Sequence, residues 1–200
     1  MANPVRVIPA DYREVHYLKL TTTSLLIWLN LLSLIPLVMS GLLVFGLLLV
    51  YHEELGAVLV IDALPNTIPT LPGLVLTLLV LPLHEWIHGQ MIKRVGHEPR
   101  YGVKWMVLFA TSKGGVFRRN EFIDVALAPL VIITSAGIVL MLFLPLGLAQ
   151  WVGLAIVMNA AGAIGDLWMT VVALRYDRSV LVRDEEDSMR IFATQPAKET

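Results

Sequence analysis

Three side chains within five residues could bind a metal ion and use it. The segment His84-Glu85-Trp86-Ile87-His88 has the pattern H-E-x-x-H. On a helix, residues four positions apart lie on the same face, so both imidazoles can reach one ion. The glutamate between them can then act on a water molecule bound to that ion. The motif predicts a zinc hydrolase with one Zn²⁺, in which His84 and His88 are metal ligands and Glu85 is the general base.

The composition indicates that this chemistry takes place in a membrane protein. Of the 200 residues, 56% are hydrophobic and 16% are charged, whereas soluble domains have about 45–50% apolar and about 25% charged residues. We therefore expect the lipid bilayer to be a partner. The net charge of −1 gives no reason to expect nucleic acid as another. The chain has no cysteine, so a metal ion must be held by His, Asp or Glu.

Four apolar stretches have about the 20 residues that a helical span needs. They lie near residues 25–51, 69–92, 125–148 and 151–174. The sequence therefore predicts an all-α integral membrane protein whose residues 1–200 form a single membrane domain with four transmembrane helices. The H-E-x-x-H motif lies near the end of the second predicted span.

The basic residues between the spans predict the orientation. Lys and Arg occur before the first span, between the second and third spans, and after the fourth, but the loops near 52–68 and 146–150 contain none. By the positive-inside rule, both termini are predicted to be cytoplasmic. The 93–123 loop and the 175–200 tail are then cytoplasmic too.

The cytoplasmic loop has a pattern typical of a strand. Apolar and aromatic residues alternate with other residues over 101–109, and a Thr-Ser-Lys-Gly-Gly turn signal and a short Val116-Phe117 run follow. We interpret this as a short β-hairpin at the membrane interface between the second and third helices; the alternative is an amphipathic connector. An open strand edge there could bind an unwound substrate as an additional strand.

Asp166 is the candidate for a third metal ligand. Ionisable groups inside spans are costly and usually functional, and a catalytic zinc site needs three protein ligands with one open position. His84 lies nine residues before Lys93, and Asp166 nine before Arg175, which places both about 13 Å from the cytoplasmic ends of their helices. The spacing predicts that His84, His88 and Asp166 meet at one depth. The alternative for Asp166 is an N-cap or a counter-ion of Arg175.

Other polar residues and prolines leave more than one interpretation. Asn159 lies seven residues before Asp166, on the same helical face, where it could donate to a substrate oxyanion or bond across helices. Pro82 should kink the second span next to the metal ligands, whereas Pro129 is interpreted as a packing feature. His97 could support the site or lie in a solvated loop. The acidic run at 184–187 is predicted to be a solvated face.

These residues resemble a known family. The H-E-W-I-H segment, Ala128-Pro129 at the start of the third span and the Asn159…Gly162…Gly165-Asp166 segment of the fourth are similar to small prokaryotic membrane proteins called putative zincin peptidases, which resemble site-2-type intramembrane metalloproteases. The resemblance covers about residues 80–175. It implies that His84, His88 and Asp166 are zinc ligands and that Glu85 is the general base. One departure is that Leu167 follows Asp166, where site-2 proteases usually have a glycine, and that no proline lies between Asn159 and Asp166.

We therefore expect a zinc-dependent, site-2-like intramembrane endopeptidase that cuts a membrane-protein or peptide substrate near the cytoplasmic side. Two alternatives are a non-proteolytic scaffold with a structural metal site and an ion or metal transporter. A transporter needs polar residues on both sides of its site, but residues 71–83 and 151–158 are almost all apolar apart from Thr77.

Overall fold

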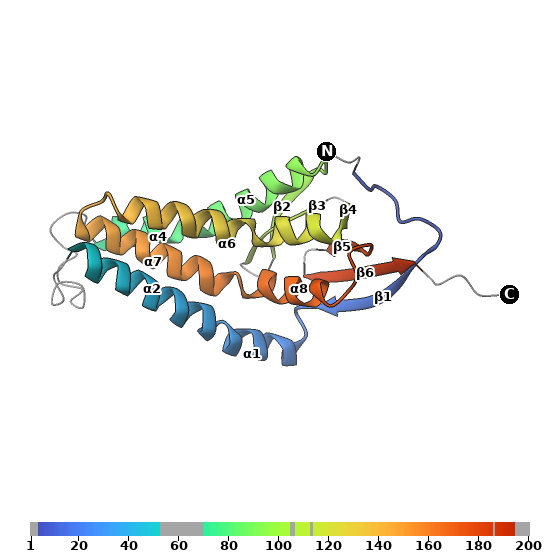
Figure 1. The fold of residues 1–200 in the computed structure, drawn as a ribbon, viewed down its shortest axis with the longest axis horizontal. Helices are drawn as coiled ribbons and strands as arrows, with labels where there is room; N and C mark the ends of the chain where they lie inside the picture. Colours follow the sequence, from blue (N-terminus) through green and yellow to red (C-terminus); the bar gives the residue numbers. More distant parts are fainter. Residues whose placement is uncertain (1–3, 53–69, 105–106, 113, 186, 195–200) are drawn as a thin grey trace. The chain divides into compact units, whose positions relative to one another are not determined.

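The computed structural model describes residues 4–52, 70–104, 107–112, 114–185 and 187–194. Within these ranges the chain folds into helices and strands, which Figure 1 shows in chain order. The helices are α1 (Thr23–Leu32), α2 (Leu34–His52), α4 (Thr70–Leu78), α5 (Val80–Arg94), α6 (Arg119–Met141), α7 (Leu146–Gly162) and α8 (Ile164–Leu174). The strands are β1 (Tyr12–Lys19), β2 (Pro99–Lys104), β3 (Val107–Ser112), β4 (Val116–Arg118), β5 (Leu181–Glu185) and β6 (Ser188–Thr194).

The prediction of an all-α protein with four spans is wrong. Six strands form two antiparallel sheets, so the chain has a mixed α/β fold. The described residues contain two helices long and apolar enough to cross a membrane, Thr23–Tyr51 and Arg119–Met141. A third span results only if the bent pair Leu146–Gly162 and Ile164–Leu174 counts as one.

The second predicted span is broken into two shorter helices. Residue 69 of that span lies outside the described residues. Helix α4 ends at Leu78 and has 9 residues, and α5 begins at Val80 and has 15 residues. Pro82 has no N–H to donate to the carbonyl of Leu78, so the regular hydrogen-bond pattern fails at this point. The kink predicted at Pro82 is thus a break in the helix.

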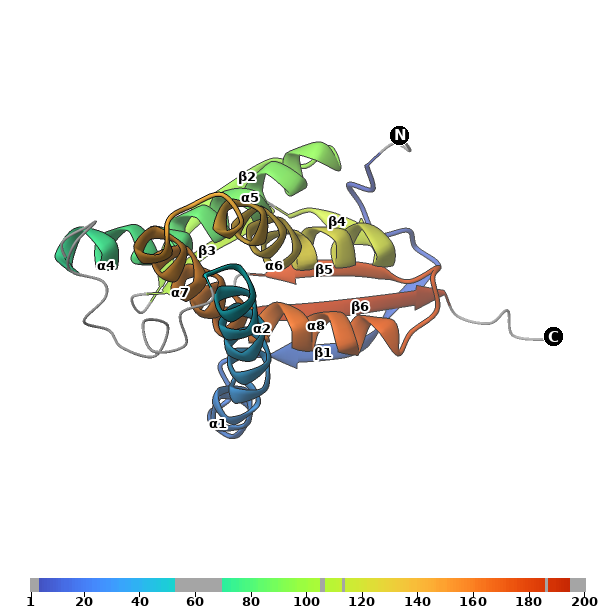
Figure 2. The ribbon, with the colours of Figure 1, turned by 60° about the vertical axis from the view of Figure 1, so that its left-hand side comes forward.

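Strands β1, β5 and β6 lie in segments that were not predicted to be strands, and each contains charged residues. The four-stranded sheet has the order β1-β6-β5-β4, and in Figure 2 β5, β6 and β1 lie side by side. β1 pairs with β6 in a register that joins Tyr12 to Thr194 and Lys19 to Ser188. The predicted tail therefore contains two strands, and its apolar side chains Val182, Met189 and Ile191 are fully buried in the core of this part.

The predicted β-hairpin is present, but its two strands are not the predicted ones. β2 pairs with β3 from Pro99 with Ser112 to Lys104 with Val107, so residues 101–109 contain parts of two strands; residues 105–106 lie outside the described residues. Val116 of β4 pairs with Arg183 of β5 instead of closing the hairpin. Alternation alone could not separate one long strand over 101–109 from two shorter ones, because both have the same period of two.

The described residues form two compact units. The first consists of residues up to Leu29, Glu85–Ala128 and the chain from Gly165 onwards, and the second of Asn30–His84 and Pro129–Ile164. The core of the first unit joins residues of α5, α6 and α8 to those of the sheet, among them Ile92, Phe122, Val172 and Val182. This unit therefore combines helix and sheet around one core.

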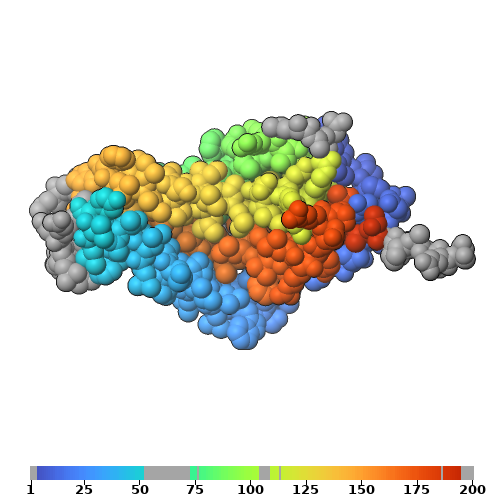
Figure 3. Space-filling view, viewed as in Figure 1, coloured from blue at the N-terminus to red at the C-terminus, as the bar shows by residue number. Residues whose placement is uncertain are grey.

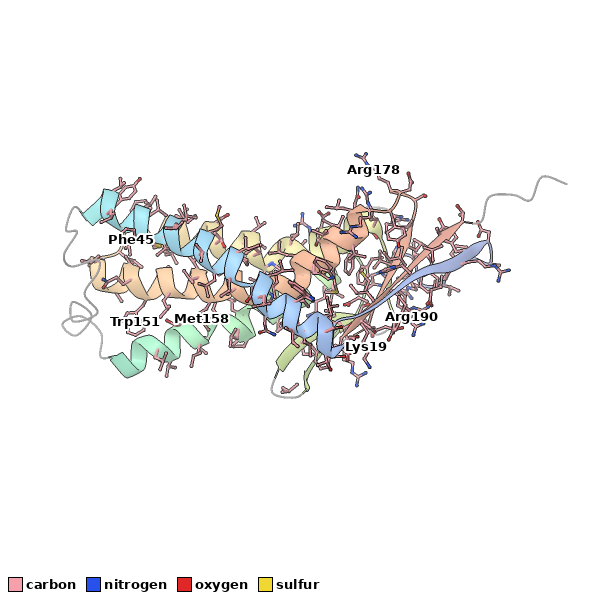
Figure 4. All side chains as sticks on the ribbon, turned by 90° about the horizontal axis from the view of Figure 1, so that it is seen from below. Lys19, Phe45, Trp151, Met158, Arg178 and Arg190 are labelled. Carbon is pink, nitrogen blue, oxygen red and sulfur yellow. The ribbon has the colours of Figure 1, made fainter. Side chains whose placement is uncertain are left out.

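The second unit is built from closely packed apolar helices. Val44, Met141, Ala149 and Ile156 belong to its core, and α2 and the second half of α6 form the face seen in Figure 3. Gly73 lies against the indole ring of Trp151, where a β-carbon would collide. In Figure 4 the labelled Phe45 and Met158 lie on α2 and α7, whereas many nitrogen and oxygen atoms lie on the strands near Lys19 and Arg190.

Candidate metal centre

Helix α5 carries the H-E-x-x-H motif in its first three turns. His84 and His88 are 8% and 7% exposed, and Glu85 is half-buried. The helix continues without a break from Val80 to Arg94, so the two histidines lie one turn apart on one face. The helix itself therefore brings their rings together, as the spacing predicted.

His88 is held by a backbone carbonyl of α6. Its Nδ1 lies 2.9 Å from the carbonyl oxygen of Val125. In a regular helix this carbonyl would accept from the residue four positions later, but that residue is Pro129, which has no N–H. The carbonyl of Val125 is thus available to accept from Nδ1–H, which leaves Nε2 of His88 with its lone pair for a metal ion.

His84 is held by Asn159 of α7. Nδ1 of His84 lies 2.9 Å from Oδ1 of Asn159, whose side chain is 1% exposed. The amide nitrogen of Asn159 donates in turn to the carbonyl oxygen of Pro129 over 3.4 Å. This second bond orients the amide so that Oδ1 faces the imidazole and accepts from Nδ1–H. Because Nδ1 of His84 faces Asn159, Nε2 of the same ring points away from Asn159.

Asp166 completes a group that could hold a metal ion. It lies in the first turn of α8, and its Oδ2 is 3.5 Å from Nε2 of His88. Among the described residues, one ligand atom each of His84, His88 and Asp166 lies within 4.8 Å of the others. In a tetrahedral zinc site with bonds of about 2.0–2.2 Å, ligand atoms are roughly 3.4 Å apart. The His88–Asp166 separation already has this value.

The donor set fits zinc. Two imidazoles and one carboxylate are a ligand set of catalytic zinc sites, which leave the fourth position open. In such sites the second nitrogen of each histidine is usually bonded to a carbonyl or a carboxylate. Both histidines meet this condition, one through a side-chain amide and one through a backbone carbonyl.

A sequence family described as "Putative zincin peptidase" matches residues 77–181. This region is 105 of the 200 residues and contains the whole H-E-x-x-H motif and Asp166. The chain belongs to this family. No curated protein and no solved structure matches it. For a zincin-family chain, the group of two histidines and one aspartate is the expected place for the metal ion.

One residue near the zincin motif was missed in the sequence. Asp184 lies in β5 and was expected on a solvated face, yet it is half-buried, and Oγ1 of Thr111 donates to its Oδ2 over 3.1 Å. Burial raises the pKa of Asp184 to about 6, against the opposing effects of the Thr111 hydrogen bond and the charge of His88. Asp166 and Glu85, which are also acidic, raise it further. Asp184 is therefore within electrostatic range of the candidate centre.

His97, the other loop residue considered from sequence, lies apart from the ligand group. Its ring packs edge-on against Phe117 with centroids 4.8 Å apart. Burial lowers the pKa of His97. His97 thus belongs to the packing between the α5–β2 loop and the start of β4.

Proposed function

We propose that this protein is a zinc-dependent endopeptidase that cuts a peptide bond at the membrane, close to its cytoplasmic side, in the manner of site-2 proteases. The observation that carries the proposal is the anchoring of both histidines of the H-E-x-x-H motif through Nδ1. With Nδ1 of each ring bonded, Nε2 is the nitrogen that would bind an ion, and Asp166 would add a carboxylate. Metal-binding histidines usually have their second ring nitrogen bonded in this way.

Each residue then has a defined task. His84, His88 and Asp166 would hold a zinc ion, which would supply a Lewis acid at this place. Glu85 accepts the proton of the attacking water and gives it to the leaving amine, so water is divided between the two products. Glu85 is suited to this because α5 places it beside the ligands and only half exposed to solvent.

Asn159 acts on the ligand rather than on the substrate in this proposal. Its Oδ1 and Nδ2 are each bonded within the protein. The interpretation that it bonds across helices is therefore favoured over a role as an oxyanion donor.

The membrane location is supported by the apolar helices and by the charges at their ends. Thr23–Tyr51 and Arg119–Met141 can each cross a bilayer, and apolar side chains on α1 and α2 such as Trp28 and Met39 are more than 60% exposed. Lys93 and Arg94 end α5, and by the positive-inside rule these charges support a cytoplasmic edge close to the proposed metal ligands. We accordingly propose a multi-pass protein with both termini in the cytoplasm.

The proposal is tested by comparing Glu85→Gln with Glu98→Gln, the same change at an exposed loop residue. The full chain, purified in detergent and loaded with zinc, is incubated with a mixed library of unstructured decapeptides, and the products are identified by mass spectrometry. Glu85→Gln should lower the cleavage rate at least about 100-fold and still bind one zinc ion per chain. Glu98→Gln should match the wild type.

Two results would reject the peptidase. One is cleavage by Glu85→Gln at the wild-type rate, and the other is a wild-type protein that binds no zinc. Zinc bound tightly by a wild type that cleaves no peptide and no co-expressed membrane protein would favour the scaffold with a structural metal site.

A further inference from the structure

A polar groove lies in the first unit, between the β2–β3 hairpin and the β5–β6 hairpin. Its volume is about 520 Å³, within the range of about 300–1,000 Å³ that ligand sites occupy. β3 contacts β5 here, and the hydrogen bond from Thr111 to Asp184 joins the two strands. All of the described side chains that line the groove are polar or charged, apart from Gly114.

Several of these side chains have hydrogen-bonding capacity that the protein does not use. Ser112 is 4% exposed, and its Oγ is buried without a partner. The Nε of Arg183 is also buried without a partner, although the guanidinium lies over the ring of Phe192 at 5.7 Å. Buried polar atoms in folded proteins are nearly always bonded, so unbonded ones in a groove indicate a ligand that completes them.

Asp184 provides a negative charge in the same groove. Within the described part of the chain it forms no ion pair, and Thr111 is its hydrogen-bond donor. A carboxylate removed from water is costly unless a cation or further donors compensate it. The groove is therefore suited to a ligand that brings a positive charge to Asp184.

One residue of the groove senses charges of the candidate metal centre. The charge of Asp184 interacts with those of His88, Asp166 and Glu85, and such interactions weaken with distance and with solvent screening. A peptide backbone has one donor and one acceptor per residue, so its carbonyls could accept from Ser112 and Arg183.

We propose that this groove binds an extended segment of the substrate polypeptide, with a lysine or arginine side chain of the substrate paired to Asp184. The inference rests on the proposed function for the identity of the ligand as a substrate. The inference specifies the substrate class: a polar peptide segment that carries a basic side chain, and not a purely apolar membrane helix.

Binding tests the proposal without the need for cleavage. The zinc-loaded Glu85→Gln full chain is titrated against three fluorescent unstructured decapeptides that differ only at the centre, with Lys, norleucine or Glu. The Lys peptide should bind about tenfold more tightly than the norleucine peptide, as a charge-assisted hydrogen bond would give, and the Glu peptide should bind most weakly. Adding Asp184→Asn should remove the preference for Lys and leave binding of the norleucine peptide unchanged.

Two further variants separate binding from folding. The amide in Asp184→Asn keeps an oxygen that can accept from Thr111. Asp11→Asn makes the same change at an exposed turn residue, and this control variant should keep the preference for the Lys peptide. Ser112→Ala should weaken all three peptides by a similar factor. The thermal unfolding midpoint of each variant shows whether the fold is retained.

The groove proposal is overturned if all three peptides bind equally, or if the preference for Lys persists in Asp184→Asn. Its outcome is independent of the peptidase proposal. A Lys preference that depends on Asp184, in a protein whose wild type cleaves nothing, would support the groove and reject the peptidase. Cleavage that is unaffected in rate and sequence preference by Asp184→Asn would support the peptidase and reject the groove.

Discussion

Nδ1 of His88 on α5 is held at 2.9 Å by the backbone carbonyl of Val125 on α6. This carbonyl is available because Pro129, four residues later, has no N–H to donate to it. A proline inside an apolar helix thus accounts for the partner of Nδ1 of His88, a residue of the group that could hold a metal ion. The carbonyl of Pro129 also accepts from the amide of Asn159, which is in turn bonded to His84.

Replacing Pro129 by alanine should weaken zinc binding. The new N–H would donate to the carbonyl of Val125 and compete with His88, whose ring would lose its fixed orientation. Since hydrogen-bond partners of metal ligands are worth about 10–100-fold in affinity, we expect the zinc Kd to rise about tenfold. Competition with a chromophoric chelator measures this Kd.

Pro36→Ala is the matched control for that variant. It also replaces a helical proline, on α2, where the carbonyl of Pro36 accepts from the hydroxyl of Ser40. Zinc affinity should not change. An unaltered zinc Kd in Pro129→Ala would show that the carbonyl of Val125 does not orient His88.

Asn159→Ala should distinguish the two roles that the sequence left open for this residue. If Asn159 orients His84, loss of its amide raises the zinc Kd about 10–100-fold, and excess zinc restores peptide cleavage. If it instead stabilises an oxyanion, the zinc Kd is unchanged and cleavage falls by about 100-fold or more at saturating zinc. Asn120→Ala, an exposed position at the start of α6, controls for the substitution itself.

The raised pKa of Asp184 predicts a pH-dependent stability. The pKa rises from 3.8 in the unfolded chain to about 6 in the fold, so between these values the folded protein holds a proton that the unfolded chain has released. Wild-type stability should therefore decrease as the pH rises from about 4 to about 6. Asp184→Asn does not lose stability in this way, so its free energy of unfolding at pH 7.5 should exceed that of the wild type by about 1–3 kcal/mol.

The measurement is the difference in thermal unfolding midpoint between Asp184→Asn and the wild type, followed from pH 7.5 to pH 4.5 in EDTA. The chelator is needed because a nearby zinc ion would favour the charged carboxylate. The difference should shrink towards acidic pH. A difference that stays constant over this range would contradict the raised pKa.

The helical part of the candidate centre could be predicted because its geometry is local. Residues four apart on any helix share a face, so the pairing of His84 and His88 followed from their spacing alone. Asp166 was identified because carboxylates are rare in apolar stretches and because its distance from Arg175 matched that of His84 from Lys93. The apolar helices over Thr23–Tyr51 and Arg119–Met141 overlap the spans predicted near 25–51 and 125–148, because both follow from long hydrophobic runs.

The sheet could not be predicted in the same way. β1 pairs with β6 across more than 160 residues, for instance Tyr12 with Thr194. Short strands with several charged residues, such as Leu181–Glu185, look like a solvated tail when charges alone are considered. The all-α prediction failed because no local signal shows that two such segments will pair.

The sequence by itself determined that this protein has H-E-x-x-H on a helix, apolar segments able to cross a membrane, and a lone aspartate suited to be a third ligand. The tertiary structure decided what surrounds that group. It brought the carbonyl of Val125 to His88 and the amide of Asn159 to His84, and it placed Asp184 near the ligands from a strand at the end of the chain. Contacts of this kind join residues far apart in sequence, and they form only when helices and strands pack around a common core.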